Sequence, residues 1–413
     1  MKRFPALLAA AALLASTTLL AQDTTALDDS IRRHRMGTLV IEVKPGAKVQ
    51  VEQLRHEFWF GAALANEAFN GEMPVVDAER YKATFLQKFN CAVTENALKW
   101  LDMEPERGAV DYATVDAILT WTTRNGLPLR GHNIYWGSSH WVQPWLKQLD
   151  DAELRAALQA RGEDIARRYR GRFAEYDFNN EMIHGDYYAD RLGAGITREM
   201  ADWVLAQDPG AKLWANDYDI LTGRRLADYV AHIQQLQAAG IPIAGIGVQG
   251  HLHGDSFDPA ALQGALDELG KLGLPIRVTE FNFPGQRSKF YEKRDLPITP
   301  EEEQAKARAL VDYYRICFAH PSVTGILMWG FWEGANWIPQ SSLYRRDWSA
   351  TPAAIAYHNL VFKEWWTRAS LKADKSGRIE LPAFYGTYRI TAGKKSTTVT
   401  LRKADGNATA SLR

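Results

Sequence analysis

Two glutamates, Glu181 and Glu280, each end a short apolar run that is typical of a buried strand. The first run covers residues 176–181 and the second covers residues 275–280. In parallel α/β folds ligands collect at the carboxyl ends of the strands, so we expect the two carboxylates to face each other across one cleft. Such a pair suits glycoside hydrolysis, in which one carboxyl protonates the leaving oxygen and the other attacks the anomeric carbon or activates water. A lone glutamate is more often a surface charge or an ion-pair partner, but neither role suits the end of a buried strand.

The elements that must position these carboxylates follow a regular strand–helix rhythm. Apolar runs occur at residues 58–63, 89–94, 128–135, 173–180, 212–216, 243–249, 275–280 and 324–331. Helical patterns lie between them at residues 77–88, 111–125, 151–170, 197–207, 223–239, 258–272 and 300–319, and typical helix starts are Asp77, Asp150 with Glu153, Thr197, Asp258 and Thr299. This alternation predicts an α/β fold of the (β/α)8 TIM-barrel type, in which Glu181 ends the fourth strand and Glu280 the seventh. A dinucleotide-binding sheet does not fit, because no glycine-rich turn follows the first strand.

The segments outside this rhythm predict the rest of the domain organisation. Residues 1–21 have the basic start and apolar run of a secretory signal peptide, too short for a membrane anchor, so we expect a secreted or periplasmic protein. Residues 37–53 alternate between apolar and polar around Pro45 and Gly46, which predicts an amino-terminal β-hairpin segment over 22–56. The catalytic barrel is expected over 57–366. Residues 367–413 predict a carboxy-terminal β tail that forms a small β unit with the hairpin.

Composition excludes several classes of partner and cofactor. Lys+Arg and Asp+Glu both number 49, so the formal net charge is zero and a broad nucleic-acid surface is not expected. Cys91 and Cys317 lie in apolar surroundings and read as buried free thiols. His251 and His253 lack a third ligand at a suitable spacing, so we predict no metal and no cofactor. The sequence does not predict an oligomeric state.

Many of the 14 Trp and 16 Tyr residues lie in loops, where aromatic rings can stack on sugar rings. We expect platforms for distal sugars among Trp141, Trp145, Tyr187, Tyr188 and Trp332. Three residues at the end of the fifth strand, Asn216, Asp217 and Tyr218, are expected to line the cleft without taking part in the reaction.

The strand ends carry motifs that occur together in one known family. In chain order these motifs are Phe60–Ala63, Thr94–Trp100, Arg130–His132, Asn180–Glu181, Gly247–His251, Thr279–Phe281 and Trp329–Gly330. This series resembles glycoside hydrolase family 10, the endo-β-1,4-xylanases, over about Phe58 to Trp366. Any one motif would be weak evidence, whereas the ordered series is specific.

The resemblance implies a role for each matching residue. Glu181 would be the acid/base and Glu280 the nucleophile of a retaining mechanism, with the carboxyl groups about 5–5.5 Å apart. The pKa of Glu181 would be raised, most simply by the charge of Glu280. Asn180 would bond the sugar 2-hydroxyl, while Gln249 and His251 would hold the nucleophile. The remaining residues implied by the family are Asn96, Lys99, His132 and Trp136, which would bind sugars on the non-reducing side, and Trp329 and Trp337, which would wall the cleft.

Three features depart from the family pattern. Gly137 stands where the family usually has His, and the Gln-Pro-Trp of the loop 138–145 comes late. Asn282 replaces the usual Asp that orients the His beside the nucleophile, so His251 gains no charged partner and a shifted pH profile is expected. The Gly137 loop and the flanking β segments are more similar to the plant-type branch of the family.

The sequence therefore predicts a secreted, retaining endo-1,4-β-xylanase that acts on polysaccharide without a cofactor. One alternative keeps the chemistry but uses another plant β-glycan or a decorated xylan. A second alternative is a catalytically silent carbohydrate-binding barrel, against which the joint presence of Asn180, Glu181, His251 and Glu280 argues.

Overall fold

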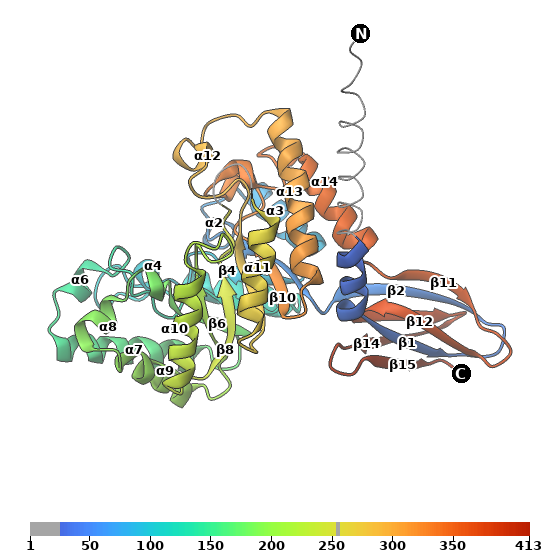
Figure 1. Cartoon of the computed structure of the whole chain (residues 1–413), viewed down its shortest axis with the longest axis horizontal. Coiled ribbons are helices and arrows are strands. Elements are labelled where there is room, and N and C mark those ends of the chain that lie inside the picture. The colour runs from blue at the N-terminus through green and yellow to red at the C-terminus, as the bar shows by residue number, and fades with distance from the viewer. Residues whose placement is uncertain (1–24, 253–256) are drawn as a thin grey trace, which may run out of the picture. The chain divides into compact units, whose positions relative to one another are not determined.

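The computed structural model describes residues 25–252 and 257–413, so the expected signal peptide at 1–21 and His253 lie outside the described residues. The chain forms two compact units (Figure 1). The larger unit comprises residues 58–313 and 322–364. The smaller unit comprises the chain up to Glu57 together with residues 314–321 and 365–413. The expected barrel over 57–366 therefore differs from the larger unit at residues 314–321 and by one or two residues at each end.

The larger unit is a closed barrel of parallel strands in the order β10-β3-β4-β5-β6-β7-β8-β9. Its strands are β3 (Trp59–Leu64), β4 (Cys91–Thr94), β5 (Leu129–Gly131), β6 (Glu175–Asn180), β7 (Leu213–Asp217), β8 (Ile243–Val248), β9 (Ile276–Phe281) and β10 (Val323–Met328). Each strand overlaps one of the apolar runs, so the predicted (β/α)8 fold is confirmed. The run at 128–135 outlasts β5 because Ile134 and Tyr135, both fully buried, belong to the loop that follows the strand.

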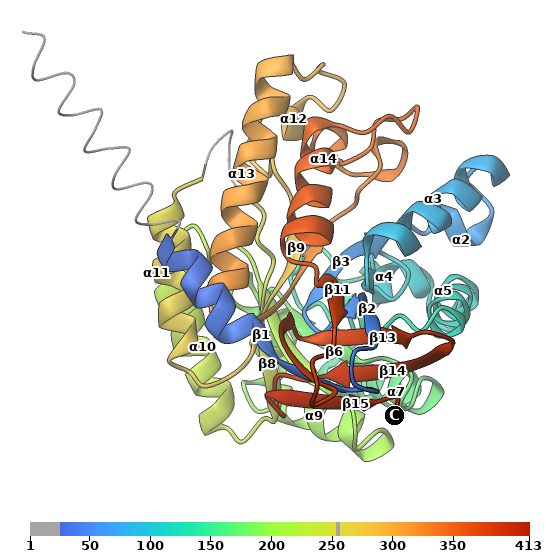
Figure 2. The ribbon, with the colours of Figure 1, turned by 90° about the vertical axis from the view of Figure 1, so that its right-hand side faces the viewer.

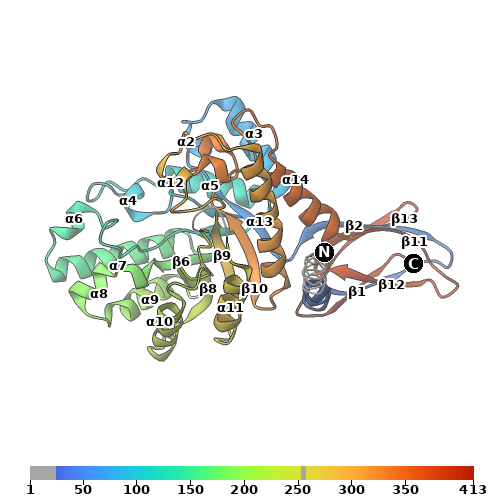
Figure 3. The same cartoon turned by 45° about the horizontal axis from the view of Figure 1, so that its top comes forward.

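Helices surround this barrel (Figures 1 and 3). The longer ones are α3 (Val75–Lys88), α5 (Ala113–Arg124), α7 (Asp151–Arg168), α9 (Ile196–Gln207), α10 (Leu226–Ala238), α11 (Pro259–Gly270), α13 (Pro300–Ala319) and α14 (Pro352–Asn359). Short helices lie in the loops: α2 (Glu67–Asn70), α4 (Trp100–Met103), α6 (Pro144–Lys147), α8 (Tyr187–Leu192) and α12 (Lys289–Glu292). The long helices and the strands alternate along the chain, which places every strand's carboxyl end at the same face of the barrel.

The helix starts show which capping predictions hold. Asp150 and Glu153 form a reciprocal capping box at α7, and Asp258 accepts bonds from two backbone N–H groups of α11. Thr299 accepts a bond from the backbone N–H of Glu302 at 3.3 Å. The predictions for Asp77 and Thr197 are wrong, since α3 starts after Pro74 and α9 after Gly195, and neither cap uses a side chain.

A set of buried ionic side chains lies inside the barrel. Arg130 on β5 forms ion pairs with Glu175 and Asp177 on β6, and its side chain is fully buried. Arg277 on β9 lies 3.3 Å from Glu175. Asp177 also contacts Nδ1 of His132 at 2.8 Å. The interior charges are therefore paired with one another, and they reach a residue of the predicted site.

Replacing Arg130 by Leu should lower the free energy of unfolding by about 3–5 kcal/mol, because the change leaves two buried carboxylates short of a partner. Urea unfolding followed by tryptophan fluorescence measures the loss. The matched control is Arg167→Leu, which removes an exposed i,i+4 pair with Glu163 and should cost less than about 1 kcal/mol. Equal losses in the two variants would show that the interior ion pairs add nothing special to stability.

Within the described residues, the smaller unit starts with a helix over residues 25–35, which was not predicted from the sequence. Two sheets follow, with strand orders β12-β1-β15 and β11-β2-β13-β14. Their strands are β1 (Met36–Glu42), β2 (Lys48–His56), β11 (Arg368–Lys372), β12 (Arg378–Phe384), β13 (Gly386–Ala392), β14 (Lys395–Leu401) and β15 (Asn407–Ser411), and Figure 2 shows β13 beside β14. One cluster of buried apolar residues draws on both sheets.

The predicted hairpin between β1 and β2 is wrong. β1 pairs with β12 and β15, whereas β2 pairs with β11 and β13. The reason is that Leu39 and Ile41 of β1 and Val49 and Val51 of β2 all enter the same core. The turn at Pro45 thus carries the chain from one sheet to the other, and both strands pair with the carboxy-terminal segment instead.

Candidate active site

The two candidate carboxylates are linked through Gln249, the residue after β8. Its backbone oxygen accepts a hydrogen bond from the backbone N–H of Glu280 at 2.8 Å. Its side chain donates from Nε2 to Oε1 of Glu181 at 2.7 Å. This differs from the expectation that the Gln249 side chain lies against Glu280. Glu181 and Glu280 therefore belong to one hydrogen-bonded group at the carboxyl ends of β6 and β9.

Glu181 directly follows β6 and adopts a left-handed backbone conformation, with φ 62°. A non-glycine residue in this region stores strain, which is common at functional sites. Its carboxyl accepts the bond from Gln249 and a second bond, at 3.0 Å, from Nε1 of Trp136 to Oε2. Burial raises the pKa of Glu181 to about 7, the charges of Glu280 and Asp217 add to the rise, and the two hydrogen bonds oppose it. Burial, rather than the Glu280 charge expected from the sequence, is the largest cause.

Glu280 lies within β9 and is only 4% exposed. Oε1 accepts a bond from Nδ2 of Asn216 at 2.9 Å, and Nε2 of His251 lies 3.2 Å from Oε2. Burial alone would raise the pKa of Glu280, but the charges of His132, His251 and Lys99 and the bond from His251 outweigh it and lower the pKa to about 2. Near neutral pH the site therefore holds one ionised carboxylate and one carboxyl that is partly protonated.

Asn282 contacts the ring nitrogen of His251 that faces away from Glu280. Its Oδ1 lies 2.9 Å from Nδ1 of His251 and accepts a bond of 2.9 Å from Nε1 of Trp337. Because an indole N–H can only donate, Oδ1 is the atom that faces both rings, and Nδ1 of His251 carries a proton. The Nδ2 of Asn282 donates to the carbonyl of Trp329 and to Oγ of Ser341. Both ends of the amide are used, and a carboxylate could not make the bond to the carbonyl.

Replacing Asn282 by Asp, the usual family residue, should therefore lower the free energy of unfolding by about 1–3 kcal/mol, because a buried carboxylate would face the Trp329 carbonyl. Thermal and urea unfolding measure the change. Ser341→Ala removes one of the two bonds donated by Asn282 and the bonds of Oγ with Asn336 and Ile338, but it buries no charge and should cost less than Asn282→Asp. An Asn282→Asp variant as stable as the wild type would refute this account of the amide.

The residues predicted for the non-reducing side lie together. Lys99 donates from Nζ to Oδ1 of Asn96 at 2.7 Å. The same ammonium lies 5.1 Å from the ring centre of Trp136 and 5.7 Å from that of Trp329. His132 stands edge-on to Trp329, with ring centres 5.0 Å apart. A cation flanked by indoles presents donors and flat apolar faces, as a bound sugar ring requires.

The structure brings all the predicted site residues into this one group. Asn180 accepts a hydrogen bond from Asn216. The ring centre of Trp337 lies 5.1 Å from that of His251. These contacts place the residues, while their roles in the reaction stay predictions. Among the described residues, no cluster of three or more His, Cys, Asp or Glu side chains suits a metal ion.

Asn216, near the end of β7, makes more contacts with the candidate site residues than its predicted place in the cleft wall implied. Its Nδ2 donates to Oε1 of Glu280 and to Oδ1 of Asn180, and its Oδ1 accepts from Thr279 at 2.6 Å. It thus orients two predicted site residues at once. The signal that found Glu181, a polar residue ending a buried strand, was present here too.

Asp217 holds the loop that follows Glu181. Its carboxylate accepts from the backbone N–H of Ile183 at 3.0 Å and contacts Nδ1 of His184 at 2.6 Å. The ring of His184 stacks on Tyr218, with centres 3.6 Å apart. The end of β7 therefore supports the turn in which Glu181 stands.

Steric crowding explains why a glycine occupies position 137. A Cβ at this position would come within 2.6 Å of Oδ1 of Asp186 and 3.1 Å of the Tyr188 ring. The loop after β6 is held there by a bond from the backbone N–H of Tyr187 to the carbonyl of Gly137 at 2.7 Å. The histidine usual in the family would displace this loop.

Two of the expected sugar platforms are wrong. Tyr188 and Trp332 are buried, at 1% and 4% exposure. Trp332 stacks on Trp348, so its ring serves the core. Trp141, at 40% exposure, is the expected platform residue that does reach solvent to a large extent.

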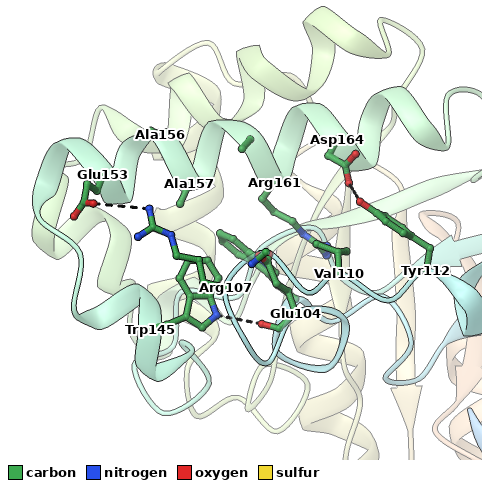
Figure 4. Close-up of a pocket in the computed structure, with 13 residues that line it drawn as sticks. Glu104, Arg107, Val110, Tyr112, Trp145, Glu153, Ala156, Ala157, Arg161 and Asp164 are labelled. Carbon is green, nitrogen blue, oxygen red and sulfur yellow. Dashed lines mark hydrogen bonds and ion pairs between the residues drawn. The ribbon is translucent and has the colours of Figure 1, made fainter.

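A cavity of about 520 Å³ is lined by the expected platform residue Trp145 but by neither candidate carboxylate and by none of the residues predicted to bind the cleaved sugars (Figure 4). Its polar lining is largely paired internally, as Figure 4 shows for Arg107 with Glu153 and for Tyr112 with Asp164. Arg161, which also lines it, donates to the carbonyls of Leu98 and Ile134. This wall therefore supports, from behind, the loops that carry Lys99 and Trp136.

Comparison with known proteins gives matches over most of the chain. The model of the family described as "Glycosyl hydrolase family 10" matches residues 51–360. The chain is 34% identical over 349 residues to endo-1,4-beta-xylanase 1 of Arabidopsis thaliana, covering 84% of this chain and 34% of that protein. It is 35% identical over 388 residues to the anti-sigma-I factor RsgI6 of Acetivibrio thermocellus, covering 92% of this chain and 48% of that protein. The chain thus spans less than half the length of these two curated relatives.

A solved structure, native xylanase 10B from Thermotoga maritima, superposes with a TM-score of 0.65 at 22% identity, covering 75% of this chain and 96% of that one. At this low sequence identity, the structural likeness supports a shared barrel fold and nothing further.

Proposed function

The chain belongs to glycosyl hydrolase family 10, and from that premise we propose that it is an endo-1,4-β-xylanase that cleaves the xylan backbone with retention of configuration. The observation that carries this proposal is the opposite shift of two pKa values within one hydrogen-bonded group. Burial raises the pKa of Glu181 to about 7, while neighbouring positive charges hold the pKa of Glu280 at about 2. A retaining glycosidase needs this combination of one ionised carboxylate and one protonated carboxyl.

In the first step a carboxylate oxygen of Glu280 attacks the anomeric carbon as the bond to the leaving oxygen breaks. Glu181 gives its proton to that oxygen, so the leaving sugar departs as an alcohol and a glycosyl ester of Glu280 remains. In the second step the Glu181 carboxylate takes a proton from water, the water oxygen bonds to the anomeric carbon, and Glu280 is released as a carboxylate. Two inversions at the same carbon give net retention.

Asn180 supports the placement of the sugar. Its side chain is 1% exposed, and its Nδ2 has no hydrogen-bond partner in the described part of the chain. Its Oδ1 is held by Asn216, so the amide is fixed with a donor left over. An unpaired buried donor is costly, and a sugar hydroxyl beside the anomeric carbon would satisfy it.

The choice of xylan is supported by the names of relatives, such as the endo-1,4-beta-xylanases of A. thaliana. The test is reducing-sugar release from glucuronoxylan, arabinoxylan and cellulose, combined with proton NMR of the first anomer formed. We expect release from the xylans and a β-anomer as first product. Faster release from cellulose would favour another β-glycan, binding without cleavage would favour a silent barrel, and an α-anomer would refute retention.

We also propose that the protein is exported to the periplasm or the medium. The support is the sequence of residues 1–21, in which Lys2 and Arg3 precede an apolar run. Fractionation of a bacterial host that expresses the full chain, with mass spectrometry of the amino terminus, tests this proposal. Cytoplasmic protein that retains residues 1–21 would show that it is wrong.

A further inference from the structure

Two tryptophans of the loop after β5 form a stacked pair next to Glu181. The ring centres of Trp136 and Trp141 are 4.7 Å apart, and the ring planes differ by 20°. Trp136 donates its indole N–H to Oε2 of Glu181 at 3.0 Å. Trp141 itself makes no hydrogen bond to Glu181, and 40% of its surface is exposed. It therefore stands one ring away from the carboxyl.

The carboxyl of Glu181 is fixed from both sides by these contacts. Oε1 accepts from Gln249 and Oε2 accepts from Trp136, so the group cannot rotate without losing a bond. Gln249 is buried and held by its backbone bonds to Asp217 and Glu280. The bond from Trp136 depends on the tilt of an indole ring, because a hydrogen bond weakens steeply as its angle departs from linearity.

Trp141 packs on the Trp136 ring, and the Lys99 ammonium lies 5.1 Å from the centre of the same ring. The loop around Trp141 is itself held in shape. The backbone N–H of Trp141 bonds to the carbonyl of Ser138 at 2.8 Å, and Lys147 donates to the carbonyl of Ser139 at 2.6 Å. The ring of His140 stands edge-on against Trp141 at 4.7 Å.

We infer that Trp141 is a positioning residue for the acid step: by stacking on Trp136 it holds the indole N–H on Glu181 and keeps that carboxyl oriented toward the leaving oxygen. This inference rests on the proposed role of Glu181 as the acid. It assigns Trp141 an effect on proton donation, which differs from the role of a platform for distal sugars.

The test compares two aryl β-xylobiosides of the same shape, one with a 2,4-dinitrophenyl and one with a phenyl leaving group. Dinitrophenolate departs without a proton, whereas phenolate needs the acid, and neither substrate places a sugar beyond the cleaved bond. For Trp141→Ala we expect kcat/KM on the phenyl substrate to fall about tenfold, a part of the 10²–10⁴-fold that a general acid contributes. On the dinitrophenyl substrate the fall should stay below about twofold.

Two further readouts separate positioning from folding. Trp141→Phe keeps a flat ring and should restore most of the activity on the phenyl substrate. In Trp141→Ala the alkaline limb of the pH profile should move to higher pH, because an indole of Trp136 that no longer donates to Oε2 stops lowering the pKa of Glu181. The matched control is Trp121→Ala on α5, whose ring packs edge-on against Phe69 at 5.5 Å. It should leave the ratio of the two substrates unchanged.

Equal losses on the two aryl substrates would overturn the inference and make Trp141 a binding or folding residue. Full activity of Trp141→Ala on both would overturn it as well. Glu181→Ala, measured beside these variants, must slow the phenyl substrate far more than the dinitrophenyl one. If it does not, the proposed function fails, whatever Trp141 does.

Discussion

Replacing Glu280 by Gln should abolish hydrolysis, with kcat on xylan lowered by about 10⁴- to 10⁶-fold, because an amide cannot form the glycosyl ester. Gln keeps the shape of the side chain, and its oxygen can still accept the bond from Asn216. The loss of activity should therefore come from the chemistry, in a variant that still folds. Initial rates on a xylo-oligosaccharide measure the effect, and circular dichroism checks the fold.

The matched control for this experiment is Glu268→Gln, which removes an exposed carboxylate paired with Lys271. It should hydrolyse xylan at the wild-type rate. If Glu280→Gln keeps more than about 1% of the wild-type kcat, covalent catalysis by Glu280 is excluded, since loss of a nucleophile normally costs far more.

Replacing Glu181 by Ala should lower kcat/KM on substrates with poor leaving groups by about 10²- to 10⁴-fold, the usual contribution of a general acid. The variant should also lose the alkaline limb of its pH profile. The acid works only when protonated, and burial raises the pKa of Glu181 to about 7. Wild-type activity should therefore fall as the pH rises through about 7, whereas the variant has no such proton to lose.

Azide gives a second readout for the same variant. Azide can attack the glycosyl ester of Glu280 without help from a base, so it should speed the second step in Glu181→Ala and yield a β-glycosyl azide. A variant that still loses activity near pH 7, or that is unaffected by azide with the dinitrophenyl substrate, would contradict the assignment of Glu181. Gln249→Ala is a milder companion, because it removes only the bond to Oε1.

The pKa of Glu280 determines how the activity depends on pH on the acidic side of the pH–activity profile. Glu280 acts only when deprotonated, and neighbouring positive charges lower its pKa to about 2. The acidic limb should therefore lie well below the ordinary range of a glutamate, so that activity persists through mildly acidic pH. A variant without one of these cations should show the limb at higher pH.

The amino-acid sequence by itself determined the barrel and the face on which the candidate site lies. Apolar runs that alternate with helical patterns specify burial locally, and the observed strands β3–β10 overlap those runs. A polar residue that ends a buried strand must stand at the carboxyl face of a parallel barrel. For this reason Glu181 and Glu280 could be paired although they are far apart in the chain.

Only the tertiary structure decided which side chains meet. Gln249 bonds to Glu181, and Asn216 joins Glu280 to Asn180, because barrel closure sets the distances between neighbouring strand ends. Asn282 serves four groups, and this explains an amide where the family usually has a carboxylate.

The hairpin prediction was wrong because a sequence pattern does not identify the partner of a strand. Alternating residues in β1 and β2 show that each strand has a buried face, but they do not show which strand is its partner. The periodicity of apolar residues indicates which positions of a strand or helix are buried. The identity of its neighbours depends on how distant segments pack, and that packing exists only in the folded chain.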